Sequence, residues 1–254
     1  MKNLPLSGRY LFALAIIGIG LVHFVTGNFP SSLLPVPAMT GRLLLVYLIG
    51  FVFCAGGISL FFERVALTGA IIIGTTFLIL FLFPHLPKLL SNVTDPGEWT
   101  VAAETLALCC GAFIVASVLA VKNHSTIKLN SLLSKALKLA PYVFALSLIV
   151  FAVQHYLYAK FISAIVPSWM PAPMFLSYLV MIVFIITSFS ILFNIQRRNS
   201  ALVFGSMFLI MFLILHIPRV INNPHLETEW TSMFIALAMS GIGFMLAING
   251  KKPE

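Results

Sequence analysis

Apolar residues occur along the chain in eight long runs, separated by short segments that are richer in polar residues, glycine or proline. The runs span residues 10–25, 43–62, 65–83, 99–121, 139–157, 174–193, 200–215 and 230–248. A helix of about 20 apolar residues crosses the hydrocarbon core of a bilayer. Because that core holds no water, the backbone of each run must satisfy its own hydrogen bonds. The pattern therefore predicts an all-α polytopic membrane protein with eight transmembrane helices.

One stretch of the chain occurs twice. Residues 74–100 (GTTFLILFLFPHLPKLLSNVTDPGEWT) align without a gap with residues 205–231 (GSMFLIMFLILHIPRVINNPHLETEWT), and 12 of the 27 positions are identical. The shared residues include a histidine, a proline, an asparagine, a glutamate and a tryptophan, which a chance match between apolar helices does not explain. Residues 10–23 and 142–155 match in a similar way, so the repeat also includes the first run of each half.

The repeat divides the chain into two halves of four spans each. We expect a first unit at residues 1–121, a basic cytoplasmic linker at 122–138 and a second unit at 139–254. An even number of spans gives both halves the same orientation, so an axis along the membrane normal should relate them. The expected architecture is two parallel-repeat four-helix bundles. The first run is interpreted as a retained span rather than a secretory signal, because its internal copy cannot be a signal.

Composition supports a membrane protein and argues against several soluble classes. Hydrophobic residues make up 60% of the chain and charged residues 9%, whereas a soluble domain is about one-quarter charged. Cys54, Cys109 and Cys110 lie inside apolar runs and form neither a zinc motif nor a disulfide framework, so no metal site is assigned. The sequence contains no nucleotide-binding loop and no hydrolase nucleophile motif.

The basic residues are distributed unevenly between the two sides of the predicted membrane. Eight spans place 11 of the 15 Lys and Arg residues on the side of the termini, and leave Arg42, Lys88, Lys160 and Arg219 on the other side. Short loops rich in Lys and Arg stay in the cytoplasm. We therefore expect a multi-pass protein of a cell membrane, the inner membrane of a bacterium, with both termini cytoplasmic. The net charge of +8 then reflects topology, so the lipid bilayer is the expected partner and nucleic acid is not.

Each half carries two histidines, one glutamate and one tryptophan near the outer end of its spans. Ionisable groups at membrane depth are costly and point to function by default. We therefore take the histidines and glutamates as candidate ligand-binding residues, without assigning a catalytic residue. The set in the first half is His23, His85, Glu98 and Trp99, and the set in the second half is His155, His216, Glu229 and Trp230.

Structural roles compete with this functional interpretation. Trp99, Trp169 and Trp230 fit as anchors at the membrane interface, where an indole keeps its N–H in contact with water. Glu98 and Glu229 stand at helix N-termini, where a carboxylate complements the helix dipole. The histidines near the prolines are expected to satisfy backbone carbonyls that proline leaves free. The prolines expected to end the third span of each half are Pro87 and Pro218.

Glu104 is a further candidate ligand-binding residue, and it has no counterpart in the second half, where Ile235 stands. It lies about 7 Å below the interface, at the rise of a helix. A lone carboxylate at that depth should be protonated or partnered, and Arg42 and His85 are the candidate partners. The first half is therefore expected to be the more chemically specialised one.

The turn after the first span of each half resembles a known family. In the second half, the span ends in His-x5-Phe, and a Pro-x-Trp-x-Pro turn leads into the next span. This pattern resembles the DoxX-like family of four-span membrane domains, over nearly the whole chain as two tandem copies. The family takes its name from a small membrane subunit of a thiosulfate:quinone oxidoreductase, so the resemblance implies the fold and leaves the activity open. The matching residues are His155, Phe161, Pro167, Trp169 and Pro171, against His23, Phe29, Pro35 and Pro37 in the shorter turn of the first half, which lacks the tryptophan.

Several functions remain compatible with the sequence. The first is a non-catalytic accessory membrane protein that works with other membrane or redox subunits, since no catalytic motif is present. The second is a membrane component of a redox system that binds a quinone head group, with His23, His85 and Glu98 as hydrogen-bonding or proton-transfer groups. The others are a haem or metal site that uses His23 and His85, and a transporter.

Overall fold

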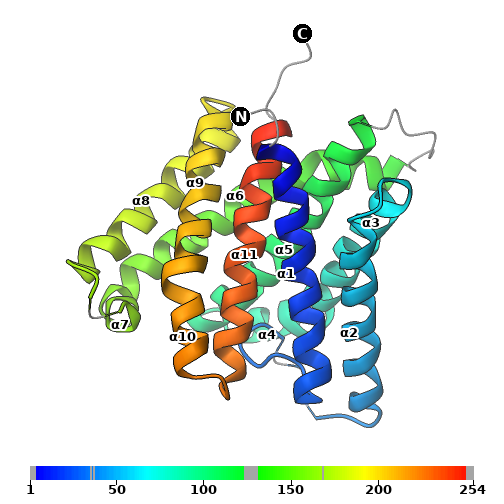
Figure 1. The fold of residues 1–254 in the computed structure, drawn as a ribbon, viewed down its shortest axis with the longest axis horizontal. Coiled ribbons are helices and arrows are strands. Elements are labelled where there is room, and N and C mark those ends of the chain that lie inside the picture. Colours follow the sequence, from blue (N-terminus) through cyan, green and yellow to red (C-terminus); the bar gives the residue numbers. More distant parts are fainter. Residues whose placement is uncertain (1–3, 35, 37, 123–130, 168, 250–254) are drawn as a thin grey trace.

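The computed structural model describes residues 4–34, 36, 38–122, 131–167 and 169–249, and in this part of the chain the fold is all-α (Figure 1). The first half consists of α1 (Leu4–Thr26), α2 (Arg42–Ser59), α3 (Glu63–Leu80), η1 (Phe81–His85), α4 (Leu86–Ser91) and α5 (Pro96–Lys122). The second half consists of α6 (Ser131–Leu157), α7 (Ala159–Ile165), α8 (Pro173–Leu192), α9 (Arg197–Met211), η2 (Phe212–His216), α10 (Ile217–Asn222) and α11 (Glu227–Asn249). The elements η1 and η2 are single π-helical turns that join α3 to α4 and α9 to α10.

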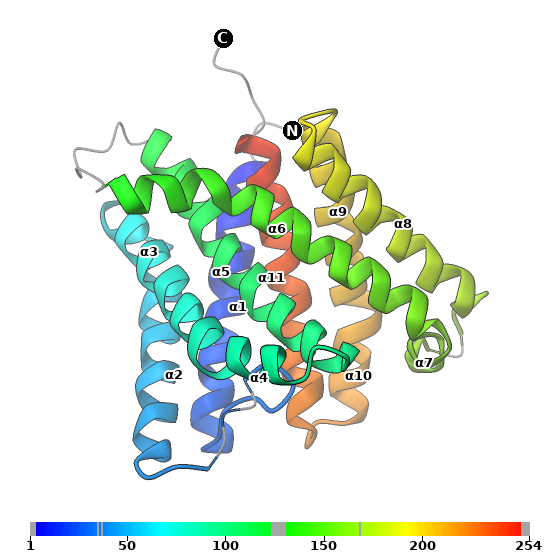
Figure 2. The ribbon, with the colours of Figure 1, turned by 180° about the vertical axis from the view of Figure 1, so that it is seen from behind.

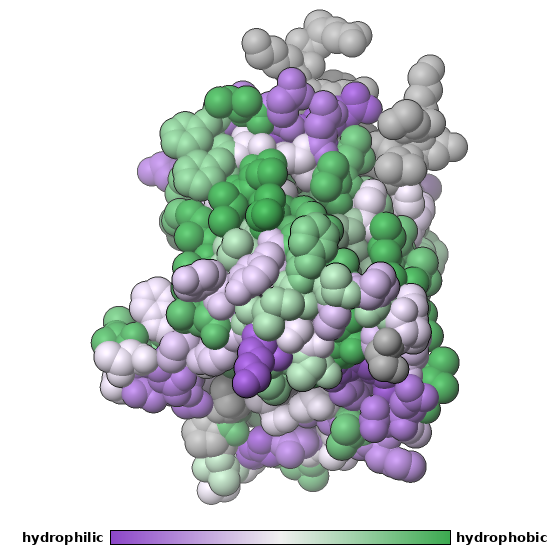
Figure 3. All heavy atoms as spheres, turned by 90° about the vertical axis from the view of Figure 1, so that its left-hand side faces the viewer, coloured by the Kyte–Doolittle hydropathy of each residue, from purple (hydrophilic) through white to green (hydrophobic). Residues whose placement is uncertain are grey.

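Eight of the described helices are long and apolar enough to cross a membrane, as the apolar runs predict. Large apolar side chains cover the outside of these helices: Leu44, Phe83 and Leu132 are exposed by 74%, 75% and 76%. Figure 3 shows hydrophobic side chains over the middle of one face and hydrophilic ones gathered toward its two ends. A surface of this kind is stable only in lipid, and the chain is a multi-pass membrane protein.

The helices α5 and α11 form the centre of the structure. They have the most buried apolar stretches of the described spans, 67% for α5 and 83% for α11, and they pack against each other. At their crossing, a Cβ atom on Gly111 would lie 2.2 Å from the side chain of Ile242, so the small glycine lets that side chain fit between the two helices. The helices α1 and α9 pack along α11, and α3 and α6 pack along α5 (Figures 1 and 2).

The two halves interlock rather than standing as separate bundles. The first span of each half packs along the fourth span of the other half: α1 lies along α11, and α6 lies along α5. Two polar contacts also join the first half to the second half. The backbone amide and the hydroxyl of Ser31 donate to Glu227 at 3.1 and 2.9 Å. The side-chain amide of Gln154 donates to the carbonyl of Pro96 at 2.8 Å.

The start of α6 and the ends of the two third spans differ from the boundaries expected from the sequence. The helix α6 begins at Ser131, so the second part of the expected linker 122–138 is helical, while residues 123–130 lie outside the described residues. The lysines at the start of α6 suggest a polar linker, but this part of the helix is amphipathic: Lys135 is exposed and Leu137 is buried. The prolines Pro87 and Pro218 do not end the third spans, because α4 continues to Ser91 and α10 continues to Asn222.

Candidate functional site

The candidate residues lie at one end of the structure, opposite the chain termini, which we call the loop end. This end carries the loops at residues 27–41, 92–95, 166–172 and 223–226, and its α10–α11 loop is at the bottom of Figure 1. His23 lies in the last turn of α1, His85 is the last residue of η1, and Glu98 lies in the first turn of α5. Their counterparts His155, His216 and Glu229 hold the same places in α6, η2 and α11.

Both histidines of the repeated stretch end a π-helical turn. Each turn is followed by a helix with proline at its second residue, Pro87 in α4 and Pro218 in α10. A proline has no amide hydrogen to give to the preceding turn, and it is tolerated at the start of a helix, where that donor is free. A second proline, Pro84, occurs only in η1, so the shared proline accounts for the turn in both halves. Single π-helical turns inside α-helices are frequent at functional sites.

His85 is held in a buried polar cluster. Its Nε2 atom lies 3.1 Å from the hydroxyl of Thr105, and that hydroxyl also lies 3.3 Å from the carbonyl of Leu33. His85 is 2% exposed, and Thr105 and Leu33 are 0% exposed. The loop at 27–41 therefore folds into the helices and brings a backbone acceptor to the hydroxyl, because a buried polar group needs a partner.

His23 is buried beside the same loop. Its Nδ1 atom lies 2.8 Å from the carbonyl of Ile19, one turn earlier in α1. Its ring meets Phe29 and Phe53 edge to face, with centroids 5.8 and 5.9 Å away. Its Nε2 atom is buried and has no hydrogen-bond partner among the described residues. The loop thus touches His23 through Phe29 and lies against the His85 cluster through Leu33.

The second half repeats part of this arrangement. The Nδ1 atom of His155 lies 3.0 Å from the carbonyl of Phe151, and its ring meets Phe184, the counterpart of Phe53, at 5.1 Å. The position of Thr105 is occupied by Ala236, so His216 has no equivalent hydroxyl. Among the described residues, no partner reaches the buried Nδ1 atom of His216. Within the residues that the structure describes, the closed histidine–threonine cluster is therefore a feature of the first half.

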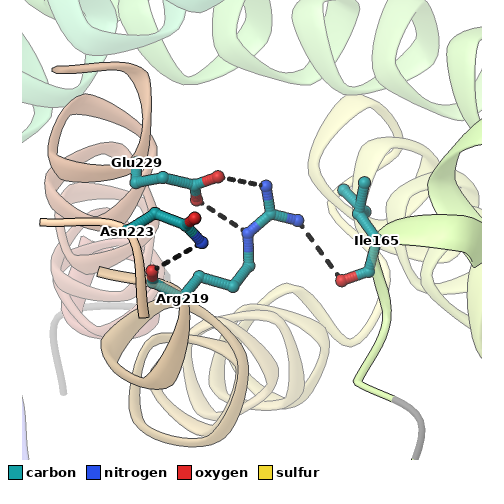
Figure 4. A network of polar contacts seen from close by, with 4 residues as sticks. All are labelled: Ile165, Arg219, Asn223 and Glu229. Atoms are coloured by element: carbon teal, nitrogen blue, oxygen red, sulfur yellow. Dashed lines mark hydrogen bonds and ion pairs between the residues drawn. The ribbon is translucent and has the colours of Figure 1, made fainter. Parts of the chain in front are cut away.

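The two glutamates of the repeated stretch form equivalent ion pairs. Glu98 lies 2.6 Å from the ammonium of Lys88. Arg219, which stands where the first half has Lys88, donates to Glu229 through Nε at 2.7 Å and through Nη2 at 2.6 Å (Figure 4). Arg219 also donates through Nη1 to the carbonyl of Ile165 at 3.3 Å, which fixes the end of α7. Each pair ties the end of the third span to the start of the fourth.

The tryptophans secure the same loops. The indole N–H of Trp99 donates to the carbonyl of Val93 at 2.8 Å, and that of Trp230 donates to the carbonyl of Pro224 at 2.9 Å. Their rings are 41% and 36% exposed, so each indole lies at the surface while its polar atom is bonded. Trp169 is 65% exposed in the loop before α8. All three positions are compatible with membrane-interface anchors.

Glu104 differs from the other candidates. It is partly buried on α5 beside Thr105, and it makes no hydrogen bond or ion pair with another residue that the structure describes. Arg42, one expected partner, donates to the carbonyl of Val36 at 3.3 Å and lies over the ring of Phe29. His85, the other expected partner, contacts Thr105. The expectation that either residue pairs with Glu104 is therefore wrong for the described residues.

Several residues of the site are not predicted from the sequence. Thr105 stands in an apolar run with no motif around it, and the Leu33 carbonyl acts through the backbone, so neither leaves a sequence signal. Lys88 and Arg219 did leave one, since both are basic and precede the repeated glutamate by ten positions. Within the described parts of the chain, no three His, Cys, Asp or Glu side chains come together as metal ligands.

Comparison with known protein families, with curated proteins and with solved structures finds no match to this chain. The resemblance to DoxX-like membrane domains therefore stays a prediction from the residues quoted above. Function must accordingly be argued from the site itself.

The His85 cluster gives a prediction about stability. Thr105→Val keeps the shape of the side chain and removes the hydroxyl that links the histidine to the carbonyl of Leu33. We expect the free energy of unfolding to fall by about 1–2 kcal/mol, because a buried polar group loses its partner. Thermal unfolding of the purified protein in detergent measures this loss. Thr76→Val is the control, since that exposed hydroxyl bonds only within its own helix, and equal melting temperatures for both variants would contradict the prediction.

Proposed function

We propose that the chain is a non-catalytic accessory protein of a bacterial inner membrane that works within a larger membrane assembly. Its termini lie in the cytoplasm and its loop end faces outward, in line with the distribution of Lys and Arg. The main observation behind the proposal is that the candidate site is buried and closed to solvent. His23 and Thr105 are 0% exposed and His85 is 2% exposed, whereas binding sites for small molecules are open clefts or cavities.

The polar layer at the loop end supports the same proposal. The glutamates pair with Lys88 and Arg219, the indoles bond the loops, and the histidine of η1 bonds a threonine. In an apolar environment, these contacts fix the order and spacing of helices that hydrophobic packing alone would leave free. A membrane subunit with a rigid outer layer can hold a partner in place without reacting itself.

A second candidate function is quinone binding, and Glu104 is the observation that favours it. A partly buried carboxyl group without a partner among the described residues can hydrogen-bond the oxygen of a quinone head group. It adjoins Thr105 in the first half, and the second half has the apolar Ile235 in its place. This candidate requires an opening beside α5 that admits the head group.

One experiment separates the two candidates. The protein is purified in mild detergent, its visible spectrum is recorded, and it is extracted for quinones and metals. The accessory function predicts no stoichiometric cofactor in the wild type and no change in the extract of Glu104→Gln. About one quinone per chain that is lost in both Glu104→Gln and His85→Ala, and kept in the matched variant His216→Ala, would establish quinone binding and overturn the first proposal.

A further inference from the structure

A basic cavity lies at the end of the structure that carries the termini, away from the site described above. It is partly open, has a volume of about 340 Å³ and lies between α5, α6 and α9. Ser117 of α5 and Arg197 of α9 line it, together with residues from the first turns of α6. The residues contributed by α6 are Leu137, Lys138, Pro141 and Tyr142.

Arg197 is the group that most requires a ligand. Its Nε and Nη2 atoms are buried and have no hydrogen-bond partner among the residues the structure describes. A guanidinium group presents a planar set of donors that matches the oxygens of a phosphate or carboxylate. Leaving buried donors of a charged group unpaired costs more than leaving a neutral donor unpaired. An anion in the cavity would remove that cost.

The surroundings of Arg197 also favour an anion. Lys138 adds a second positive charge to the wall of the cavity. Both ion pairs recorded for the described residues, Lys88–Glu98 and Arg219–Glu229, lie at the loop end, so no described carboxylate neutralises Arg197 or Lys138. The hydroxyl-bearing residues Ser117 and Tyr142 complete a polar lining. Two cations with neighbouring hydroxyl groups form a typical setting for a phosphate.

The residues that line the cavity are not repeated at the position related to it by the internal repeat. At the related position of the repeat, Ala66 of α3 stands in place of Arg197 and Ile248 of α11 stands in place of Ser117. Arg9 stands where the second half has Pro141, and its Nη2 atom donates to the hydroxyl of Tyr10 at 2.8 Å. Arg9 thus bonds a tyrosine through Nη2 and has only Nε buried without a partner among the described residues, whereas Arg197 has both Nε and Nη2 in that state.

We propose that this cavity binds a phosphate-ester anion at the side of the membrane that carries the termini. Basic pockets between transmembrane helices on the cytoplasmic side bind anionic lipid head groups. The exposed Leu132 and Leu139 of α6 give the acyl chains of such a lipid an apolar surface close to the cavity. A free phosphate has the same chemistry, and the test distinguishes the two sources.

The test uses the full-length protein in a neutral detergent, titrated separately with three probes. These are short-chain phosphatidylglycerol, the matching diacylglycerol without phosphate, and inorganic phosphate. We expect saturable binding of phosphatidylglycerol, seen as a rise in melting temperature and as a bound adduct in native mass spectrometry. Diacylglycerol should not bind at this site. Saturable binding of inorganic phosphate that displaces phosphatidylglycerol would identify the free anion as a sufficient ligand.

Variants locate the site. Arg197→Gln and Lys138→Gln should each weaken phosphatidylglycerol binding by about tenfold, the loss typical of one charge-assisted hydrogen bond. Lys138 is exposed, so its variant should fold even if Arg197→Gln does not. Arg198→Gln is the matched control, because this neighbouring exposed arginine does not line the cavity. Equal binding of phosphatidylglycerol and diacylglycerol, or unchanged binding by Lys138→Gln and Arg197→Gln, would overturn the proposal.

Discussion

Gly241→Val is expected to destabilise the protein by about 3 kcal/mol or more, at the upper end of the range for overpacking a core. Gly241 lies on the face of α11 that packs against α1. A Cβ atom added there would lie 2.6 Å from the amide nitrogen of Phe12 and 2.7 Å from the carbonyl oxygen of Gly8. Both are backbone atoms, so a rotamer change cannot relieve the clash, and the two helices must separate.

Separation of α1 from α11 affects both halves at once, because α1 belongs to the first half and α11 to the second. Gly8 faces the same contact: a Cβ atom there would lie 2.9 Å from the carbonyl oxygen of Gly241. Small residues on both helices let their backbones approach closely, which drives helix association in lipid. We therefore expect loss of the folded monodisperse species rather than a local change.

Size-exclusion chromatography of heated samples in detergent measures the effect on Gly241→Val. Gly97→Ala is the control, because a Cβ atom there meets only the flexible side chain of Asp95 in an exposed first turn of α5. The control should elute and melt as the wild type does. An unchanged melting temperature for Gly241→Val would show that α1 and α11 do not pack as described.

The eight spans could be predicted because lipid imposes a single rule on every one of them. A run of about 20 apolar residues must form a helix wherever it crosses a bilayer. The choice of neighbours obeys no such rule, since any apolar face can pack against any other. The close packing of α1 on α11 depends on Gly8 and Gly241, which look like ordinary small residues within apolar runs.

The candidate site was predictable in part for a related reason. Repetition singled out the histidines, glutamates and tryptophans, and the structure places all of them at the loop end. The repeat cannot identify a hydrogen-bonding partner that occurs in only one half. Thr105 has Ala236 as its counterpart, and the carbonyl of Leu33 meets a threonine where that of Ile165 meets an arginine. The two halves place equivalent backbone carbonyls at the site, and different side chains form hydrogen bonds to them.

The ion pairs at the loop end let this difference be measured. Glu229→Gln keeps the size of the side chain and removes the charge that faces Arg219. The side chain of Glu229 is 10% exposed and that of Arg219 is 25% exposed, so water compensates the guanidinium poorly. Removing one partner of a buried ion pair is strongly destabilising, and we expect a loss of about 2–4 kcal/mol, reduced from the fully buried case by this residual exposure.

The matched variant Glu98→Gln should cost about 1 kcal/mol or less, since exposed ion pairs contribute little. Lys88 is 46% exposed, so its ammonium group regains water when the charge on Glu98 is removed. Arg219 has no such freedom, because its Nη1 atom also donates to Ile165 and ties α7 to the pair. Thermal unfolding of both variants in the same detergent compares them directly. Equal losses would mean that burial does not set the strength of these pairs, whereas a larger loss for Glu229→Gln that disappears in the double variant Glu229→Gln, Arg219→Gln would assign the cost to the uncompensated guanidinium.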